Sequence, residues 1–341
     1  MSEAAVIIPN WNGMKYLPGC LDSLQRQRFT DFSVYLVDNG SEDGSADYVQ
    51  THYPHVHLIR LSENTGFCHA VNEGIRADDS PFVILLNNDT VAAPGFVGEL
   101  VSAIRARSDA FACQAKMLSM HEKGVIDDAG DLYCALGWAF SRGRGKASSS
   151  CVRSDRIFSA CGGACIWRRS VLEQIGLLDE SHFAYLEDVD ISWRAARAGF
   201  HCYFAPKAAV LHAGSASSGS KHNAFKVKLT ARNSIWIIRK NMPVWQRVLN
   251  LPFLMAGFAI KMVYFARKGL GREYLQGLAE GLSPMKGRPG ADGFTSANGL
   301  QRAESLTSAK GRKKTAGSLR SCLDIQAQLW INTLRRIGEK V

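Results

Sequence analysis

The sequence lacks the paired cysteines that build a structural zinc site or a disulfide framework. It has nine cysteines in 341 residues, and only Cys161 and Cys165 lie close together. No second pair at a matching spacing completes a zinc site. An odd number of scattered cysteines, most of them inside apolar runs, favours reduced and buried thiols, as in cytoplasmic proteins.

The first residues also lack a secretory signal. The chain begins with the letters MSEAA, without a basic segment or a small-residue cleavage site, and an apolar run starts at once. We therefore expect a cytoplasmic protein. Charged residues make up 21% of the chain and apolar residues 46%, which excludes global disorder and allows a large core or two domains.

Negative charge is scarce in the last third of the chain. Residues 1–220 carry 19 Lys/Arg and 25 Asp/Glu, a net charge of −6, whereas residues 221–341 carry 22 and 6, a net charge of +16. A basic region of this kind can bind nucleic acid or an anionic membrane surface. No recognised nucleic-acid motif accompanies it, so we expect no nucleic-acid partner.

Short apolar runs alternate with amphipathic stretches over roughly the first 90 residues. Buried strands are predicted at 4–9, 32–37, 56–61 and 82–86, and helices at 16–27, 45–51 and 66–77. Strands that alternate with helices form βαβ units. We therefore predict an α/β fold with a Rossmann-like, mostly parallel sheet flanked by helices.

The middle of the chain is less regular. The segment 138–150 is rich in glycine, serine and arginine, and we expect a mobile loop near the functional site there. Further helices are predicted at 96–107, from 170 and at 190–199, and a strand at 203–210; ordered structure is expected to return at 157–168.

Polar residues stand at the carboxyl ends of the predicted strands, where parallel sheets bind their ligands. They include Asn10, Asp38, Asn39 and Asp89. Asp89 follows a buried run and could hold a hard cation between itself and a diphosphate. Asp38 could accept hydrogen bonds from a base or a ribose. The alternative is that both acids are ordinary turn residues.

Three acids stand close together at Glu187, Asp188 and Asp190. Adjacent carboxylates repel each other, which raises one pKa and suits a general base near neutral pH. Acids also favour helix N-termini, which is the alternative explanation. His212 follows a predicted strand and could complete a metal site with Asp89, or could be an ordinary loop residue.

Together these segments resemble the family 2 inverting glycosyltransferases, above all their rhamnosyltransferase-like branch. The matching segments are VIIPNWN at 6–12, VDNGS at 37–41, ENTGF at 63–67, LNNDT at 86–90, SACGGA at 159–164, IGLLD at 175–179, YLEDVD at 185–190 and LH at 211–212. The resemblance covers about residues 3–280. It implies a GT-A fold with a nucleotide-binding half at about 1–110 and an acceptor half at about 111–220.

The resemblance also implies a role for each site residue. Asp188 would be the catalytic base with support from Glu187, and Asp89 and His212 would ligate Mg²⁺ or Mn²⁺. The nucleotide-sugar would contact Pro9, Asn10, Asp38, Asn39, Gly66, Asn72, Asn87, Asn88, Gly162 and Gly163.

The implied reaction is a single inverting displacement. The donor would be dTDP-rhamnose or a UDP-sugar, and the acceptor a saccharide or lipid-linked saccharide in cell-surface polysaccharide synthesis. Two features depart from the family pattern: Asn87 replaces the first acid of the metal motif, and Cys68 and His69 stand where small residues are commoner. The remaining alternative is a non-catalytic membrane- or nucleic-acid-binding protein on a degenerate GT-A scaffold.

Two related enzyme classes fit the sequence less well. A processive polysaccharide synthase would carry a Gln-x-x-Arg-Trp motif and several long apolar spans, and a sugar nucleotidyltransferase would carry a glycine-rich, basic loop near its start. The sequence shows neither set of features. A transferase that adds a single sugar is therefore the favoured interpretation.

A strongly apolar segment at 249–266 stands inside the basic region. Its 18 residues include Pro252 and Lys261, so it is marginal for crossing the hydrocarbon core of a bilayer. An interfacial or re-entrant helix fits better, and a buried core helix is the alternative.

These patterns divide the chain into four parts. We predict a catalytic domain at 1–220, a helical membrane-associating region at 221–282, a flexible basic linker at 283–318 and an amphipathic helix at 319–341. The apolar segment and the basic charge predict a protein bound peripherally to the inner face of the cell membrane. The sequence predicts no oligomeric state.

Overall fold

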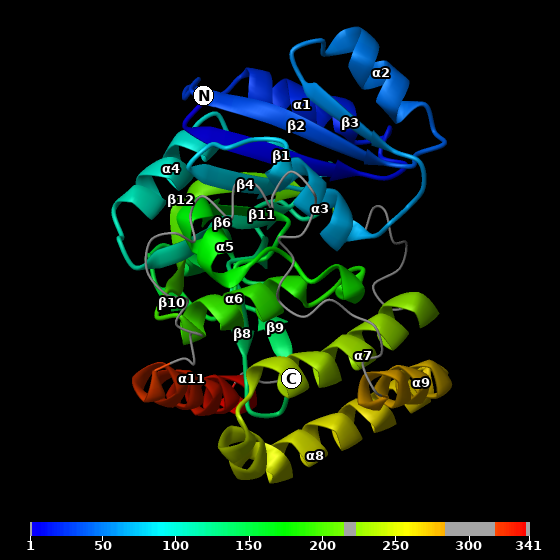
Figure 1. Cartoon of the computed structure of the whole chain (residues 1–341), viewed down its shortest axis with the longest axis vertical. Coiled ribbons are helices and arrows are strands. Elements are labelled where there is room, and N and C mark those ends of the chain that lie inside the picture. Colours follow the sequence, from blue (N-terminus) through cyan, green and yellow to red (C-terminus); the bar gives the residue numbers. More distant parts are fainter. Residues whose placement is uncertain (1, 215–222, 284–317, 339–341) are drawn as a thin grey trace, which may run out of the picture.

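The computed structural model describes residues 2–214, 223–283 and 318–338. One large sheet with helices against it forms the upper part of the molecule in Figure 1, and a layer of C-terminal helices lies below it. The predicted linker at 283–318 lies outside the described residues apart from its two end residues.

Four parallel strands form the N-terminal part of the sheet in the order β3-β2-β1-β4. These strands are β1 (Ala4–Asn10), β2 (Phe32–Asn39), β3 (His57–Leu61) and β4 (Phe82–Leu86). The helices between and after them are α1 (Leu17–Gln25), α2 (Ser45–His52), α3 (Phe67–Arg76) and α4 (Phe96–Arg105). These elements confirm the predicted βαβ alternation. It was readable from the sequence because turn residues bound each apolar run.

Mixed pairing begins beyond β4. The strand β11 (Ala164–Arg168) runs antiparallel to both β4 and β6 (Ala110–Ser119), and β12 (His201–His212) runs parallel to β6. Antiparallel pairs are added by the short strands β5 (Thr90–Ala92), β7 (Ile126–Asp128) and β10 (Arg156–Ile157). The predicted α/β class is therefore confirmed, with antiparallel strands in the second half of the sheet.

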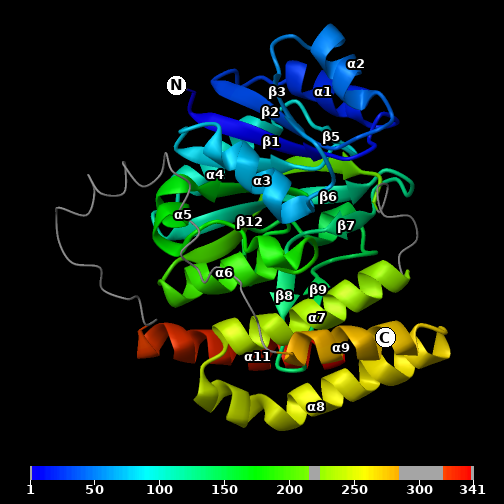
Figure 2. The same cartoon turned by 45° about the vertical axis from the view of Figure 1, so that its right-hand side comes forward.

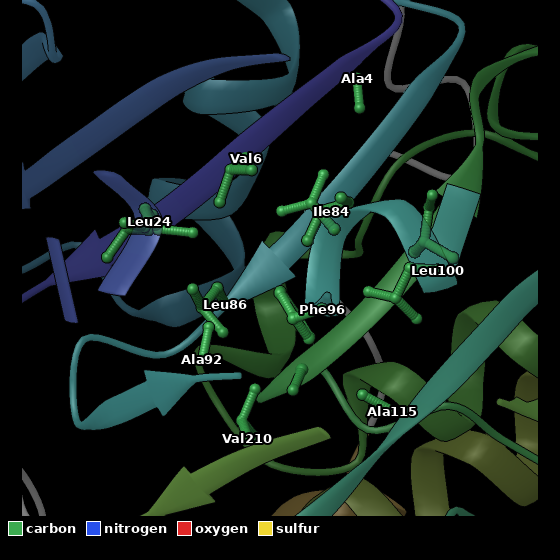
Figure 3. Close-up of a cluster of buried hydrophobic side chains, with 14 of the residues drawn as sticks. Ala4, Val6, Leu24, Ile84, Leu86, Ala92, Phe96, Leu100, Ala115 and Val210 are labelled. Atoms are coloured by element: carbon green, nitrogen blue, oxygen red, sulfur yellow. The ribbon is translucent and has the colours of Figure 1, made fainter. Parts of the chain in front are cut away.

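A buried apolar layer holds the strand ends at fixed spacing. In Figure 3, Ile84 and Leu86 of β4 lie near Phe96 and Leu100 of α4, with Val210 of β12 beside them. All five side chains are at most 2% exposed. A second apolar cluster covers the opposite face of the sheet. Because both faces are packed, the residues that follow β1, β2, β4 and β12 lie on a rigid support.

The expected mobile loop at 138–150 is wrong for part of its length. The segment contains β9 (Ala139–Ser141), which pairs with β8 (Asp131–Tyr133) in a two-stranded sheet, and the 3₁₀ turn η1 (Ser148–Ser150). The Trp138 indole donates a hydrogen bond to the Gly257 carbonyl at 3.1 Å. Trp138 and β9 thus have partners elsewhere in the chain, which the local composition of 138–150 does not reveal.

The remaining helices of the second half are α5 (Arg169–Ile175), the 3₁₀ turn η2 (Glu180–His182) and α6 (Glu187–Arg197). The C-terminal helices are α7 (Ala224–Asn241), α8 (Val244–Arg267), α9 (Gly271–Leu282) and α11 (Leu319–Gly338). Figures 1 and 2 both place α8, α9 and α11 on the side of the molecule away from β1 to β3. The helix α7 packs against α6 and α9, and α11 packs against α6 and β8.

The predicted apolar segment is the core of the longer helix α8. Among the described residues, α8 is the one helix whose length and composition would let it cross a membrane, and 22% of its apolar window is buried in the protein. Two of its polar residues are fully buried: the Gln246 amide donates to the Cys322 carbonyl, and Asn250 exchanges amide hydrogen bonds with Gln326 of α11. These bonds fix one side of α8 to the rest of the protein.

Candidate active site

The polar residues at the ends of β1, β2 and β4 form one buried hydrogen-bond chain. The Asn88 amide donates to the Asn10 side-chain oxygen at 2.7 Å, and the Asn10 amide donates to Asp38 at 3.0 Å and to the Ser45 hydroxyl at 2.9 Å. Asn10 and Asp38 face each other in the β1–β2 register. The structure therefore brings together three of the predicted nucleotide-sugar residues at the carboxyl edge of the sheet.

Asn39 orders the loop that leads into α3. Its side-chain oxygen accepts a hydrogen bond from the Thr65 N–H at 3.0 Å, and its amide donates to Asn64 at 3.0 Å and to the Gly66 carbonyl at 3.3 Å. Gly66 has a φ of +93°, and a β-carbon there would lie 2.6 Å from the Phe183 ring. This loop therefore needs a glycine both for its backbone and for its close contact with the segment before α6.

Two residues predicted to contact the nucleotide-sugar, Asn72 and Pro9, have structural positions within the protein. The Asn72 amide donates to the Leu178 carbonyl and to Glu180, both at 2.9 Å, and its oxygen accepts from the Leu178 N–H. Pro9 lies within β1 opposite Val37. Asn72 thus joins α3 to the segment before η2, and donor contacts of Asn72 and Pro9 stay predictions.

A cleft of about 390 Å³ opens beside Asp38. Gly40, Ser41 and Glu42 line it from the loop after β2, and Arg60 lines it from β3. The cleft lies beyond the carboxyl ends of two parallel strands, which is where α/β sheets bind their ligands. It is large enough for part of a nucleotide.

The Gly162–Gly163 loop closes against the end of β4. The Asn87 N–H donates to the Gly163 carbonyl at 2.9 Å. A β-carbon on Gly163 would lie 2.9 Å from the Met117 methyl group and 3.2 Å from the Asn87 amide nitrogen. Two of the predicted nucleotide-sugar residues, Asn87 and Gly163, therefore share one tight contact.

The predicted metal residues Asp89 and His212 lie side by side. His212 ends β12 and pairs in register with Thr90 of β5, so it faces the turn that carries Asp89. Its Nε2 atom lies 3.3 Å from the Asp89 carboxylate, and its Nδ1 atom lies 2.7 Å from the Asp127 carboxylate. The imidazole thus lies between two acids, one of which the sequence interpretation missed.

The charge balance of this group fits a cation site. Burial disfavours a charged imidazole, but hydrogen bonds with Asp127 and Asp89 outweigh that effect and raise the pKa of His212 to about 9. Two carboxylates therefore hold a positive charge between them. Carboxylate oxygens with one imidazole form a donor set that Mn²⁺ accepts, and Mg²⁺ accepts the carboxylates. The residues present thus fit the metal that the sequence predicts.

A second acidic group, also missed, lies along the chain from Asp127. Ligand atoms of Asp128, Asp131 and Cys161 lie within 4.8 Å of one another. Burial raises the pKa of both carboxyl groups, and the charges of Asp128 and Asp188 raise that of Asp131 further. The acids of β7 and β8 therefore extend from the His212 site towards Asp188.

The predicted acidic turn is the first turn of α6, which begins at Glu187 rather than at Asp190. The Asp188 carboxylate accepts a hydrogen bond from the Val189 N–H at 2.7 Å. Burial raises the pKa of Glu187, and the charge of Asp188 adds to this. Desolvation also raises the pKa of Asp188, with a further contribution from Asp128. A carboxylate with a raised pKa is suited to accept a proton near neutral pH.

Asp190 belongs to the same helical turn but is held differently. Arg194 and Lys240 each lie 3.0 Å from its carboxylate, and the Asn241 amide donates to it at 2.7 Å. Burial opposes its charge, but these cations lower its pKa below the ordinary value. The three neighbouring acids of the sequence therefore divide into a protonatable pair and an ionised structural residue.

The missed acids did have a sequence signal. The letters IDDAGD at 126–131 place three acids among five positions, close to the density that identified residues 187–190. The surrounding short strands hid this signal, because β7 and β8 have three residues each and pair with distant segments.

The sequence matches the family described as "Glycosyltransferase like family 2" over residues 2–235. An N-acetylglucosaminyl-diphospho-decaprenol L-rhamnosyltransferase of Mycobacterium tuberculosis is 28% identical over 262 residues, which cover 68% of this chain and 85% of that protein. A PGL/p-HBAD biosynthesis glycosyltransferase of Mycobacterium bovis is 33% identical over 88 residues, covering 25% of this chain and 34% of that one.

Solved structures show the same fold at low sequence identity. The Pyrobaculum calidifontis mannosyltransferase in complex with GDP-Man and Mn²⁺ aligns with a TM-score of 0.51 at 16% identity, over 100% of this chain and 88% of that one. S. aureus TarS with UDP-GlcNAc aligns with a TM-score of 0.52 at 16% identity, over 84% and 98%. Since the family match extends over more than half of the chain, this protein belongs to glycosyltransferase family 2 and has the GT-A fold.

Proposed function

We propose that this protein transfers one sugar from a nucleotide-diphosphate sugar to a hydroxyl group of a saccharide or lipid-linked saccharide acceptor, with inversion at the anomeric carbon. The observation that carries the proposal is the arrangement of two unlike acid groups. Asp89 and Asp127 flank His212 on one side, and Asp188, with its raised pKa, stands on the other. Asp128 and Asp131 link the two groups: Asp128 follows Asp127 in sequence, and the charges of Asp128 and Asp188 both act on Asp131.

The donor is proposed to bind at the strand ends. Asn10, Asp38 and Asn88 would orient the nucleoside and its sugar beside the cleft after β2. The mycobacterial relative is named as an L-rhamnosyltransferase, which supports dTDP-rhamnose, and the structures with UDP-GlcNAc and GDP-Man support other nucleotide-sugars as candidates. The same relative's name supports a lipid-diphosphate-linked acceptor.

Asp89 and the His212 Nε2 atom are the residues that would hold a divalent cation. Such a cation would offset the negative charge that grows on the diphosphate leaving group. Asp127 faces the other ring nitrogen, so it would orient the imidazole and fix its tautomer. Binding at Nε2 requires the neutral imidazole, so His212 must lose a proton when the cation binds.

Asp188 is proposed to act as the catalytic base. It would take the proton from the acceptor hydroxyl while that oxygen attacks the anomeric carbon from the face opposite the diphosphate. The new glycosidic bond forms as the bond to the diphosphate breaks, and the nucleotide-diphosphate leaves with the bonding electron pair. Glu187, whose pKa is raised by burial, would hold a proton beside Asp188 and limit the negative charge there.

Nucleotide release tests the reaction class. Purified protein would be incubated with UDP-, GDP- and dTDP-sugars, Mn²⁺ and a lipid-diphosphate-linked saccharide, and free nucleotide would be measured. We expect release with one donor class, dependence on acceptor, and loss of release with EDTA. Full activity in EDTA would overturn the cation site, and no acceptor-dependent release from any donor would overturn the transferase proposal.

The C-terminal helices are proposed to bind an anionic membrane surface. The apolar outer face is defined by the exposed side chains of Val244, Val248, Leu251 and Met255, which share one side of α8, and of Leu323, Trp330, Leu334 and Ile337, which share one side of α11. Lys261, which interrupts the apolar segment in sequence, is partly buried with its ammonium group over the Trp138 ring. The polar side of α8 is bonded to α11, so this helix would lie along the membrane rather than cross it.

Basic side chains support an anionic partner. Four exposed basic residues lie on or beside the C-terminal helices: Arg267 ends α8, Lys268 follows it, Arg272 is in α9 and Arg335 is in α11. Each such charge near an anionic surface contributes about 1 kcal/mol. These features support the predicted membrane-associating region at 221–282 and a location at the cytoplasmic face. An acceptor with a lipid anchor would be presented at that surface.

Vesicle sedimentation tests the membrane proposal. Val248→Glu with Met255→Glu would place two charges on the apolar outer face, and Val152→Glu is the matched control because Val152 is 62% exposed in a loop outside these helices. We expect the full chain to bind vesicles containing phosphatidylglycerol, the double variant to lose binding, and the control to keep it. Equal binding by all three proteins would overturn the apolar outer face as the contact.

A further inference from the structure

The backbone just before α6 adopts an uncommon conformation. Phe183, Tyr185 and Leu186 have φ angles of +63°, +71° and +66°. This left-handed region is unfavourable for residues with a β-carbon, and bulky side chains are uncommon in it. Three such residues within four positions therefore need outside contacts to hold them. The next residues along the chain are Glu187 and Asp188.

One asparagine of α7 supplies such contacts. Asn233 is fully buried, and its amide nitrogen lies 3.2 Å from the His182 carbonyl, 3.0 Å from that of Ala184 and 2.7 Å from that of Tyr185. An amide has two hydrogens, so the three carbonyls share them. The side-chain oxygen of Asn233 accepts a hydrogen bond from the Arg232 Nε atom at 3.0 Å.

Neighbouring groups satisfy the remaining carbonyls of this segment. Arg232 donates to the carbonyls of Ser181 and His182 at 3.2 and 2.9 Å. The N–H of Cys68 in α3 donates to the Phe183 carbonyl at 3.1 Å. Every backbone carbonyl from 181 to 185 thus has a donor, and the donors of four of the five come from α7.

The same helix also holds the far side of the first turn of α6. Lys240 and Asn241, at the end of α7, bind the Asp190 carboxylate. Contacts with α7 therefore occur both before and after the Glu187–Asp188 pair. The direction in which Asp188 points depends on the backbone between these two points.

We propose that Asn233 is a positioning residue for the transfer reaction. Its amide holds the segment at 183–186, which includes the three residues with positive φ, in the conformation that aims Asp188 at the acceptor hydroxyl. This inference rests on the proposed role of Asp188 as the base. The effect of Asn233 on the segment itself can be measured without catalysis.

A second buried asparagine provides a matched control. Asn250 of α8 is also fully buried, and its amide donates to the Gln246 carbonyl and to the Gln326 side chain. It has no hydrogen bond to the segment at 181–186 among the described residues. Replacing either asparagine by aspartate keeps its shape but exchanges an N–H donor for a carboxylate oxygen. Both changes thus perturb buried amide bonds, but only one perturbs the segment before α6.

The experiment compares Asn233→Asp and Asn250→Asp in the full chain. For Asn233→Asp we expect kcat to fall by about 100-fold, because a misplacement of about 1 Å at a reacting group has that effect, while the KM for the donor stays nearly unchanged. Hydrogen exchange should become faster at 183–190 and stay unchanged in β1 and β2. Asn250→Asp should lower the melting temperature while kcat stays near the wild-type value.

Two outcomes would overturn the proposal. One is unchanged exchange at 183–190 with wild-type kcat in Asn233→Asp, and the other is an equal loss of kcat in both variants. If Asn233→Asp does not fold, Asn233→Ser keeps one donor and is measured in the same way. If Asp188→Asn retains turnover, the base assignment fails, whereas faster exchange at 183–190 in Asn233→Asp still shows that Asn233 holds the segment.

Discussion

The acids at the strand ends and the acids at the start of α6 are similarly buried, but their neighbours differ in charge. Asp89 is 5% exposed and faces a protonated His212, whereas Glu187 is 8% exposed and forms no ion pair among the described residues. The first group surrounds a positively charged imidazole, and the second favours bound protons. One group is therefore suited to hold a cation and the other to exchange a proton.

Asp190 shows that the difference comes from neighbours rather than from burial. It shares the first turn of α6 with Glu187 and Asp188 and is fully buried, yet Arg194 and Lys240 keep it ionised. Residue type and burial are thus nearly the same for Glu187 and Asp190. The nearest cation decides which of them carries a proton.

The largest expected effect is at Asp188. Asp188→Asn should lower kcat by about 10³- to 10⁴-fold, because general-base catalysis contributes up to that much, while nucleotide affinity stays nearly intact. In the wild type, kcat/KM should rise with pH through the raised pKa of Asp188, since the ionised form is the base. Steady-state kinetics and nucleotide titration measure both, and normal turnover by the variant would refute the assignment.

Asp190→Asn should act on stability instead. Removing this carboxylate leaves Arg194 with backbone carbonyls as its acceptors, whereas Lys240 keeps Asp179 at 2.6 Å. The loss of these charged hydrogen bonds costs about 1.5–3 kcal/mol of unfolding free energy. Asp324→Asn is the control, because the Arg156–Asp324 pair is 32% and 40% exposed and such pairs contribute about 0–1 kcal/mol. Denaturant unfolding compares the two variants. Equal losses would contradict the structural role of Asp190.

Asp127→Asn tests the strand-end group. Asp127 lies 2.7 Å from the Nδ1 atom of His212 and orients the imidazole. Loss of the Asp127 carboxylate should therefore weaken Mn²⁺ binding by about 10- to 100-fold. Activity should return at high Mn²⁺ concentration, which distinguishes this residue from Asp188. Mn²⁺ titration of activity and of the electron paramagnetic resonance signal measures the change. A variant with unchanged Mn²⁺ affinity would remove Asp127 from the site.

Glu187→Gln should have the smallest effect on stability, and it should raise stability at pH 8 where Asp190→Asn lowers it. The folded protein raises the pKa of Glu187, so the stabilisation from its bound proton is present at acidic pH and is lost as pH rises through the folded-state pKa. At pH 8 the variant should be more stable than the wild type by on the order of 1 kcal/mol. Urea unfolding at pH 8 and pH 4.5 tests this, and the gain should disappear at the lower pH.

The first half of the fold was predictable because its signals are local. The strands β1, β2 and β4 are largely apolar, and the polar residues that the sequence interpretation selected end each strand or follow it directly. The start of α6 was misplaced by three residues because its first turn has left-handed neighbours that no propensity predicts. The segment at 138–150 was misjudged because the partners of Trp138 and of β9 are distant in sequence.

The sequence by itself determined the α/β class and the family, and it selected the acids at 89 and 187–190 as site candidates, since apolar periods and motif order are readable along one chain. Tertiary structure alone decided that Asp127 joins His212, that Asp190 is ionised while Glu187 holds a proton, and that Asn233 supports the backbone before Asp188. The physical reason is that pKa values and hydrogen-bond partners depend on distances across space. Those distances are set only when strands and helices pack.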